Sequence, residues 1–152
     1  MKYKNVKRII FICKYNVFRS KFAESYFKKV NKNKSMTVVS RGFIMGGRSD
    51  VNQRNIAKEL GGELKGKSVP VNLEELKKAD LIVVVASDIP KKMFDFVGRE
   101  NANFYEKTWF WKIKDEQKGR ERQVRRTLEK VKKKVDELNR KLKKANGTSK
   151  RI

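Results

Sequence analysis

The sequence contains no histidine and only one cysteine, Cys13. Without histidine the chain cannot build a Cys–His dyad, a Ser–His–Asp triad or a histidine-ligated metal site. A single cysteine excludes an internal disulfide and a structural zinc site made of paired cysteines. The chemistry of this protein must therefore use Cys13, carboxylates, hydroxyls, lysine, arginine or backbone amides, and we expect no metal or other cofactor.

Long apolar runs are absent as well. No stretch reaches the roughly 18 apolar residues that a membrane-spanning helix requires. The basic N-terminal segment MKYKNVKRIIFIC carries an apolar run that is too short for a signal peptide, and no small-residue cleavage site follows it. We therefore expect a cytoplasmic protein that does not associate with membranes.

Acidic residues are scarce, with 17 against 40 lysines and arginines, which gives a net charge of +23. Such a surplus attracts phosphates, RNA or acidic proteins through long-range fields. It would permit weak nucleic-acid binding through the basic surface. A basic proteome or a warm or saline habitat would produce the same charge, so the charge alone does not identify a partner.

The length of 152 residues suits one domain. Hydrophobic periodicity predicts strands that alternate with helices, which is typical of an α/β fold with an open parallel sheet covered on both faces. We expect the domain to span 1–145, followed by a flexible basic tail at 146–152. The expected strands are 6–12, 36–40, 81–87 and 103–109, and the expected helices are 20–30, 52–60, 73–79, 90–97 and 119–144. The last helix is long and basic, with one apolar stripe.

The segment FICKYNVFRSKFAESYF carries the strongest functional signal. Cys13 ends the first expected strand, and five residues separate it from Arg19, just before a helix. A loop of this length can turn its N–H groups inward as an anion site, to which the helix N-terminus adds positive charge. Arg19 supplies a fork for two phosphate oxygens, and Ser20 can donate a hydrogen bond to the thiolate. The alternative is that Cys13 is only a small buried core residue.

This segment resembles the active-site loop of low-molecular-weight protein tyrosine phosphatases, whose pattern is Cys-x-Gly-Asn-x-Cys-Arg-Ser-Pro. Cys13, Asn16, Arg19 and Ser20 match that pattern. The resemblance continues in Ser-Arg-Gly at 40–42 and in Ala-Asp-Leu-Ile-Val at 79–83. It implies a flavodoxin-like three-layer sandwich with a four-stranded parallel sheet.

The resemblance also implies roles for single residues. Cys13 would be the nucleophile of a phosphoric-monoester hydrolase that forms a phosphocysteine, with Arg19 as its catalytic partner. The phosphate would lie in the loop formed by Lys14, Tyr15, Asn16, Val17, Phe18, Arg19 and Ser20. The substrate would be a phosphorylated protein or a small aryl phosphate, and we expect the protein to act as a monomer.

Three positions depart from the family pattern: Tyr15 replaces glycine, Phe18 replaces the second cysteine and Lys21 replaces proline. Phe18 removes the thiol with which family members protect the nucleophile. Tyr15 could crowd the phosphate or alter the dihedral angles of the loop, or its ring could form a wall of the pocket. The sequence leaves these alternatives open.

Cleavage of a phosphate ester also needs a proton donor for the leaving oxygen. In the family this is an aspartate in an Asp-Pro loop before the last helix, and Asp115 occupies the corresponding place, with Glu116 instead of proline. Asp115 is therefore the predicted acid, and Glu116 is the second choice. Phe43 and Trp111 are the predicted rim of the substrate site, whereas core packing is the favoured role of Trp109.

Two other functions remain open. Arsenate reductases share the fold and the loop but relay a disulfide through further cysteines, so this chain would need an external thiol. Alternatively, the chain could be a catalytically weak basic module that binds RNA or acidic partners. Family members that act on phosphoarginine tend to carry threonine where this chain has Val17, which slightly favours an aryl phosphate.

Overall fold

The computed structural model describes residues 3–101, 103–114 and 121–147. Its centre is a sheet of four parallel strands in the order β2-β1-β3-β4. The strands are β1 (Arg8–Cys13), β2 (Thr37–Gly42), β3 (Leu81–Val84) and β4 (Thr108–Phe110). The α-helices are α1 (Arg19–Val30), α2 (Val51–Glu59), α3 (Leu73–Lys78), α4 (Asp95–Glu100) and α5 (Glu121–Gly147), with short 3₁₀ turns at Lys91–Phe94 and Tyr105–Lys107. The predicted fold class is therefore confirmed.

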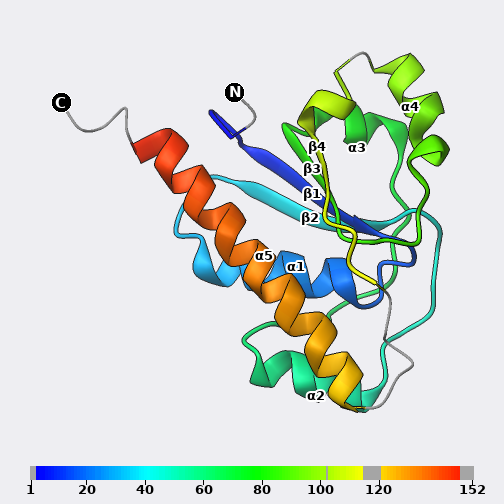
Figure 1. The fold of residues 1–152 in the computed structure, drawn as a ribbon, viewed down its shortest axis with the longest axis vertical. Coiled ribbons are helices and arrows are strands. Elements are labelled where there is room, and N and C mark those ends of the chain that lie inside the picture. Colours follow the sequence, from blue (N-terminus) through cyan, green and yellow to red (C-terminus); the bar gives the residue numbers. More distant parts are fainter. Residues whose placement is uncertain (1–2, 102, 115–120, 148–152) are drawn as a thin grey trace.

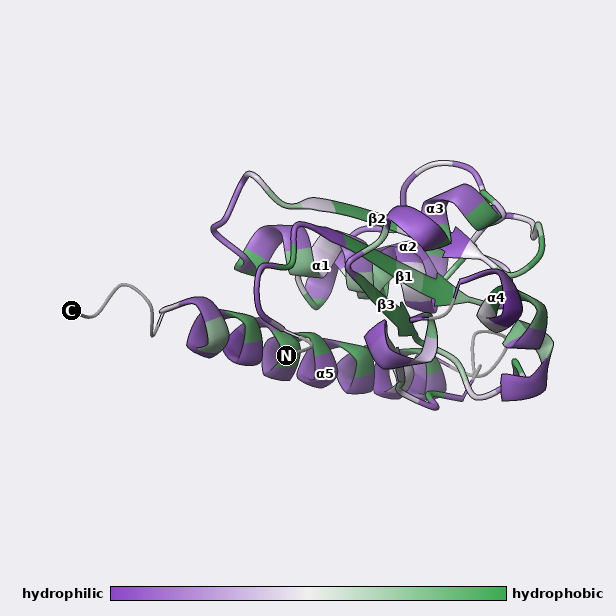
Figure 2. Ribbon diagram, turned by 90° about the horizontal axis from the view of Figure 1, so that it is seen from above, coloured by the Kyte–Doolittle hydropathy of each residue, from purple (hydrophilic) through white to green (hydrophobic). Residues whose placement is uncertain are grey.

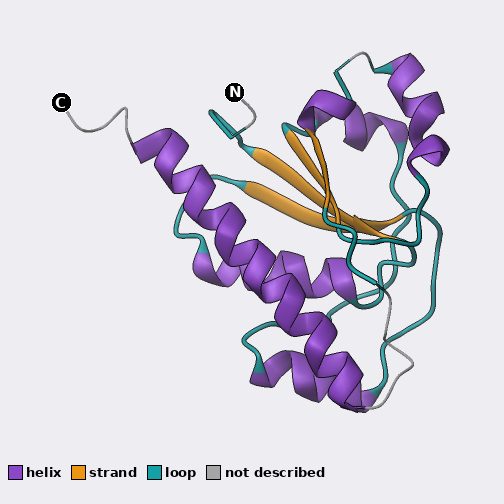
Figure 3. Ribbon diagram, viewed as in Figure 1, coloured by secondary structure: helices purple, strands orange, loops and turns teal. Residues whose placement is uncertain are grey.

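Helices cover both faces of the sheet (Figure 1; Figure 3). The side chains of β1 alternate between the two layers, as expected for a central parallel strand. Ile9 and Phe11 join the core that α1 and α5 complete, with α2 packed against α5. Ile10 and Ile12 join a second core beneath α3 and α4. Burial on both sides makes β1 a rigid support for the loop that follows it.

Helix α5 packs on the sheet side by a single apolar stripe, as the sequence predicts. Figure 2 shows this stripe turned toward the body of the molecule and hydrophilic residues on the opposite face. Its buried apolar residues are Val124, Leu128, Val131, Val135, Leu138 and Leu142. Each such side chain contributes about 1.5–3 kcal/mol when it leaves water, so the stripe is a major source of stability.

The structure corrects the expected last strand at 103–109. Residues Tyr105–Lys107 form a 3₁₀ turn, and β4 contains only Thr108–Phe110. Phe104 is instead fully buried in the second core, where its ring lies 5.5 Å from that of Phe94. A short segment with aromatic side chains can place them in a core beside a sheet as well as in a strand of that sheet.

The end of α5 also differs from expectation, since the helix continues through Gly147 instead of ending at Lys144. Asn146, assigned to the tail, belongs to this helix. Its side chain accepts a hydrogen bond from the Asn5 N–H at 3.1 Å and donates to the Leu142 carbonyl at 2.8 Å. The rest of the expected tail, 148–152, lies outside the described residues. Within the described part of the chain, no helix has both the length and the apolar character needed to cross a membrane.

Candidate active site

Cys13 is the last residue of β1, at the carboxyl edge of the sheet, where ligands bind in open α/β folds. It is 2% exposed and its thiol is free. The chain then forms a loop over residues 14–18 and enters α1 at Arg19. The structure thus has the predicted order of strand, loop and helix around the cysteine.

The sulfur of Cys13 lies 3.0 Å from the hydroxyl oxygen of Ser20, in the first turn of α1. The same oxygen accepts a hydrogen bond from the Asn16 amide at 2.9 Å. A serine hydroxyl has one proton to donate. Because Ser20 is already an acceptor from Asn16, its own proton can be directed to the sulfur. The Ser20 hydroxyl is thus placed to donate a hydrogen bond to the sulfur of Cys13.

Asn16 fixes the centre of the loop. Its backbone has φ of 53°, in the left-handed region that asparagine tolerates better than most residues. Its fully buried amide donates to Ser20 and to the Ser40 hydroxyl at 3.0 Å, and its oxygen accepts from the Val69 N–H at 3.0 Å. One side chain thereby ties the loop to α1, to β2 and to the segment before α3.

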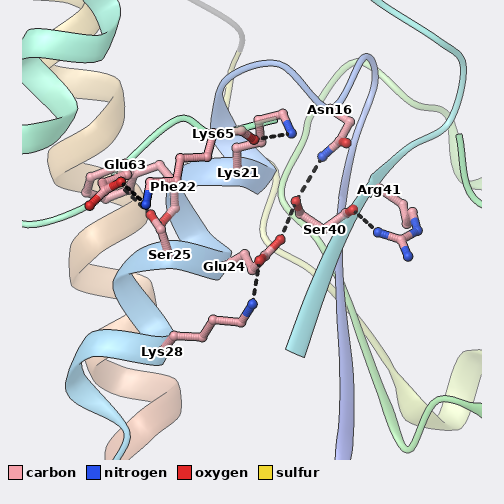
Figure 4. A network of polar contacts seen from close by, with 10 residues as sticks. All are labelled: Asn16, Lys21, Phe22, Glu24, Ser25, Lys28, Ser40, Arg41, Glu63 and Lys65. Carbon is pink, nitrogen blue, oxygen red and sulfur yellow. Dashed lines mark hydrogen bonds and ion pairs between the residues drawn. The ribbon is translucent and has the colours of Figure 1, made fainter. Parts of the chain in front are cut away.

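The network extends from Asn16 to a carboxylate on α1 (Figure 4). The Ser40 hydroxyl donates to Glu24 at 2.7 Å, and Glu24 also pairs with Lys28 at 2.7 Å. This chain of contacts orients Ser40, which in turn orients the Asn16 amide. Glu24 and Ser40 were not among the predicted site residues. The sequence signal for Glu24 is its i, i+4 spacing from Ser20, which places both residues on one side of α1.

The loop carbonyls are bonded to the surrounding segments. The Cys13 and Lys14 carbonyls accept from the N–H groups of Phe43 and Ile44, each at 2.9 Å. The Tyr15 carbonyl accepts from the Ser68 hydroxyl at 2.6 Å. Three successive carbonyls are thus turned toward flanking segments, an arrangement that suits a loop whose N–H groups serve an anion.

Tyr15 is accommodated by a glycine of the facing segment. A Cβ atom on Gly46 would lie only 2.5 Å from the Tyr15 Cβ, so no larger residue fits opposite the tyrosine. Tyr15 lines a pocket of about 410 Å³ together with Val17, Gly46 and Arg48. Tyr15 thus lines a pocket beside the loop, and its effect on a bound phosphate stays a prediction.

Two further residues of the loop are Phe18 and Lys14. Phe18 is 2% exposed and belongs to the core beneath α1, so this residue offers the loop its backbone alone. Lys14 is partly exposed, with its ammonium 5.4 Å from the centre of the Tyr15 ring. Phe18, at the N-cap of α1, makes no side-chain hydrogen bond to the first turn of the helix. Because α1 begins directly after the loop, the positive end of its dipole lies next to the loop.

Arg19 is almost entirely buried, at 2% exposure. One terminal nitrogen donates to the Ile113 carbonyl at 2.7 Å, and the other donates to both oxygens of Asp88, at 3.1 and 3.2 Å. Contacts through both terminal nitrogens fix the plane of the guanidinium. Arg19, the residue that follows the loop, therefore has its side chain held by Ile113 and Asp88.

Asp88, which contacts Arg19, was not among the residues predicted for the site. It follows the central strand β3, at the same edge of the sheet as Cys13, and its side chain is 30% exposed. A carboxylate just beyond the carboxyl end of a buried parallel strand was the available signal. The segment near β3 that resembles the family pattern, residues 79–83, ends before Asp88.

Asp115 and Glu116, the predicted acid and its alternative, lie outside the described residues. Of the predicted rim residues, Phe43 stacks on Phe94 at 5.3 Å, and Trp111 lies 6.0 Å from Phe11, partly buried against the core. Their contact with a substrate stays a prediction.

Residues 8–148 match the family model described as low molecular weight phosphotyrosine protein phosphatase. No curated protein is significantly similar in sequence. Among solved structures, the tyrosine phosphatase AmsI of Erwinia amylovora is 22% identical, with a TM-score of 0.75 over 90% of this chain and 93% of that one. The YwlE arginine phosphatase of Geobacillus stearothermophilus is 21% identical, with a TM-score of 0.75 over 91% and 94%. An arsenate reductase of Archaeoglobus fulgidus is 24% identical, with a TM-score of 0.64 over 86% and 98%. At these identities the likeness concerns the fold.

Proposed function

Because the chain belongs to the low molecular weight phosphotyrosine protein phosphatase family, we propose that it hydrolyses phosphoric monoesters with Cys13 as the nucleophile. The observation that carries this proposal is the 3.0 Å contact between the Cys13 sulfur and the Ser20 hydroxyl. A core cysteine without a catalytic role needs no such donor, whereas a thiolate does. The buried Asn16 amide, which bonds the same hydroxyl, gives this donor a fixed direction.

In the first step the Cys13 thiolate attacks phosphorus, opposite the ester oxygen. The sulfur–phosphorus bond forms, the ester bond breaks, and Asp115 gives its proton to the leaving alcohol or phenol. In the second step a water molecule attacks phosphorus and returns a proton to the Asp115 carboxylate. The sulfur–phosphorus bond breaks, inorganic phosphate leaves, and the thiolate is regenerated.

The charge that spreads over the phosphoryl oxygens in both steps needs fixed donors. The N–H groups of residues 14–18 and of the first turn of α1 would supply these donors, while the carbonyls of residues 13–15 bond flanking segments. Arg19 supplies a permanent positive charge, and its contacts with Asp88 and Ile113 keep the guanidinium in place. Asp88 is therefore proposed as a positioning residue of this site.

We propose an aryl phosphate or a phosphorylated protein as the substrate. Val17 stands where family members acting on phosphoarginine tend to carry threonine, and it is 7% exposed, which leaves no hydroxyl at this point of the loop. Phe43, which stacks on Phe94, and Trp111 offer aromatic surfaces near the carboxyl edge of the sheet.

Turnover of p-nitrophenyl phosphate by the wild type and by Cys13→Ser tests the proposal. We expect release of p-nitrophenol by the wild type and no measurable release by the variant. A variant that retains activity would contradict the proposed nucleophile. If the wild type is inactive on this ester but reduces arsenate in the presence of an external thiol, the reductase alternative is correct instead.

A further inference from the structure

A groove lined by cations lies beside the phosphate loop. It has a volume of about 310 Å³, and four basic side chains line it: Lys21, Arg48, Arg54 and Lys67. None of the described residues that line it is acidic. The four cations come from α1, from the segment before α2, from α2 itself and from the segment before α3. The fold therefore assembles one positively charged surface from separate parts of the chain.

Two contacts fix the walls of this groove. The Lys21 ammonium donates to the Lys65 carbonyl at 2.7 Å (Figure 4). It also donates to the Lys67 carbonyl at 2.9 Å, and so joins the start of α1 to the segment before α3. Arg54 donates to the Ser49 carbonyl, which joins α2 to the segment before it. An ammonium has three N–H groups, so the two carbonyls leave Lys21 a further donor for an anion.

Arg48 and Lys67 are more exposed than Lys21 and Arg54. Arg48 and Lys67 are both exposed, and they line the groove from two different segments of the chain. Their charges can meet a ligand without disturbing a contact that holds the fold.

Burial is the main cause that lowers the pKa of Lys21 from its ordinary value, and an anion in the groove would oppose that effect.

The groove begins at the phosphate loop. Val17 of that loop lines both this groove and the neighbouring pocket that contains Tyr15, and Gly47 and Arg48 are shared in the same way. Lys21 lies on α1 only two residues after Arg19. A chain whose phosphorylated residue occupies the loop would thus have its neighbouring residues close to these cations.

We propose that this groove binds acidic side chains that flank the phosphorylated residue of a protein substrate. The proposal rests on the hydrolase function above and adds the class of protein that is hydrolysed. Four cations in a groove whose described lining contains no acidic residue favour carboxylates over neutral side chains, and they disfavour basic ones. The net charge of +23 adds a long-range attraction for such substrates.

The test compares three substrates: p-nitrophenyl phosphate, a phosphotyrosine peptide flanked by aspartates and glutamates, and the same peptide flanked by asparagines and glutamines. For the wild type we expect kcat/KM to be about tenfold higher for the acidic peptide than for the neutral one, mainly through KM. Raising the salt concentration should reduce the difference.

The double variant Arg48→Gln/Lys67→Gln should lose most of this preference, measured relative to p-nitrophenyl phosphate on the same protein. Lys130→Gln/Lys133→Gln, on the exposed face of α5, removes the same charge far from the groove in sequence and should keep the preference. Equal kcat/KM for the two peptides, or an equal preference in both double variants, would overturn the groove proposal alone. Inactivity on all three substrates would instead overturn the proposed function.

Discussion

The hydroxyl of Ser20 bonds the sulfur of Cys13 at 3.0 Å and is itself fixed by the buried amide of Asn16. Cys13 ends a strand and Ser20 lies in the first turn of a helix, so the loop between them determines whether they meet. This contact connects the fold to the proposed chemistry, because it places a hydroxyl beside the sulfur that would attack phosphorus.

Replacing Ser20 by alanine should reduce kcat for p-nitrophenyl phosphate by about tenfold or more. A hydrogen bond to a charged group contributes about 1.5–3 kcal/mol, and the variant loses the one that favours the thiolate. The rate of Cys13 alkylation by iodoacetamide should fall in parallel. Ser25→Ala is the matched control, since Ser25 lies on the same helix but bonds the Phe22 carbonyl and the Glu63 N–H. Equal rates in the two variants would contradict the role of Ser20.

Asn16 should be the residue of the loop on which stability depends most. Asn16→Ala removes three buried hydrogen bonds and places alanine at φ of 53°, so we expect unfolding to become easier by about 2–4 kcal/mol. Asn16→Gly loses the same bonds but tolerates the backbone angle. Urea denaturation should therefore find the glycine variant more stable than the alanine variant by about 1 kcal/mol. The reverse order would show that the backbone conformation is not the cause.

Asp88 should affect turnover through Arg19. Asp88→Ala removes both carboxylate contacts of the guanidinium, and we expect kcat to fall about tenfold. Asp88→Asn keeps one acceptor oxygen and should lose less. Circular dichroism and KM for p-nitrophenyl phosphate should change little in either variant. An unaltered kcat in Asp88→Ala would mean that Arg19 needs no carboxylate to be oriented.

Asp115 should act as the general acid. We expect Asp115→Asn to lower kcat by about 10²–10⁴-fold, because the leaving oxygen then departs without a proton. The effect should be smaller for a substrate whose leaving group is already a good one. Glu116→Gln is the adjacent control and should stay within a few-fold of the wild type. If Glu116→Gln shows the larger loss, the two carboxylates exchange roles.

The sequence predicts much of this architecture because apolar periodicity reports burial directly. Residues 81–84 are apolar on both faces and form a central strand, and the stripe on α5 is buried as its spacing predicts. The strand expected at 103–109 failed because Phe104 is buried in a core instead of in the sheet. The aromatic side chains of a short segment do not indicate whether that segment packs in a core or pairs in a sheet.

The part of the site that could be predicted consists of residues that lie close together in the sequence. Cys13, Asn16 and Ser20 lie in one loop and helix start, and spacing alone brings them together. Asp88 meets Arg19 across 69 positions of sequence, and this contact depends on the order of strands in the sheet. The fit of Tyr15 depends likewise on Gly46, a residue of another segment.

The most direct test of the account is to trap the phosphocysteine. The wild type is mixed with p-nitrophenyl phosphate and quenched in acid within milliseconds, and intact and peptide masses are then recorded. We expect one added phosphoryl group, on the peptide that contains Cys13, and none in Cys13→Ala. A phosphoryl group on another residue, or turnover by the wild type with no covalent intermediate under these conditions, would contradict Cys13 as the nucleophile.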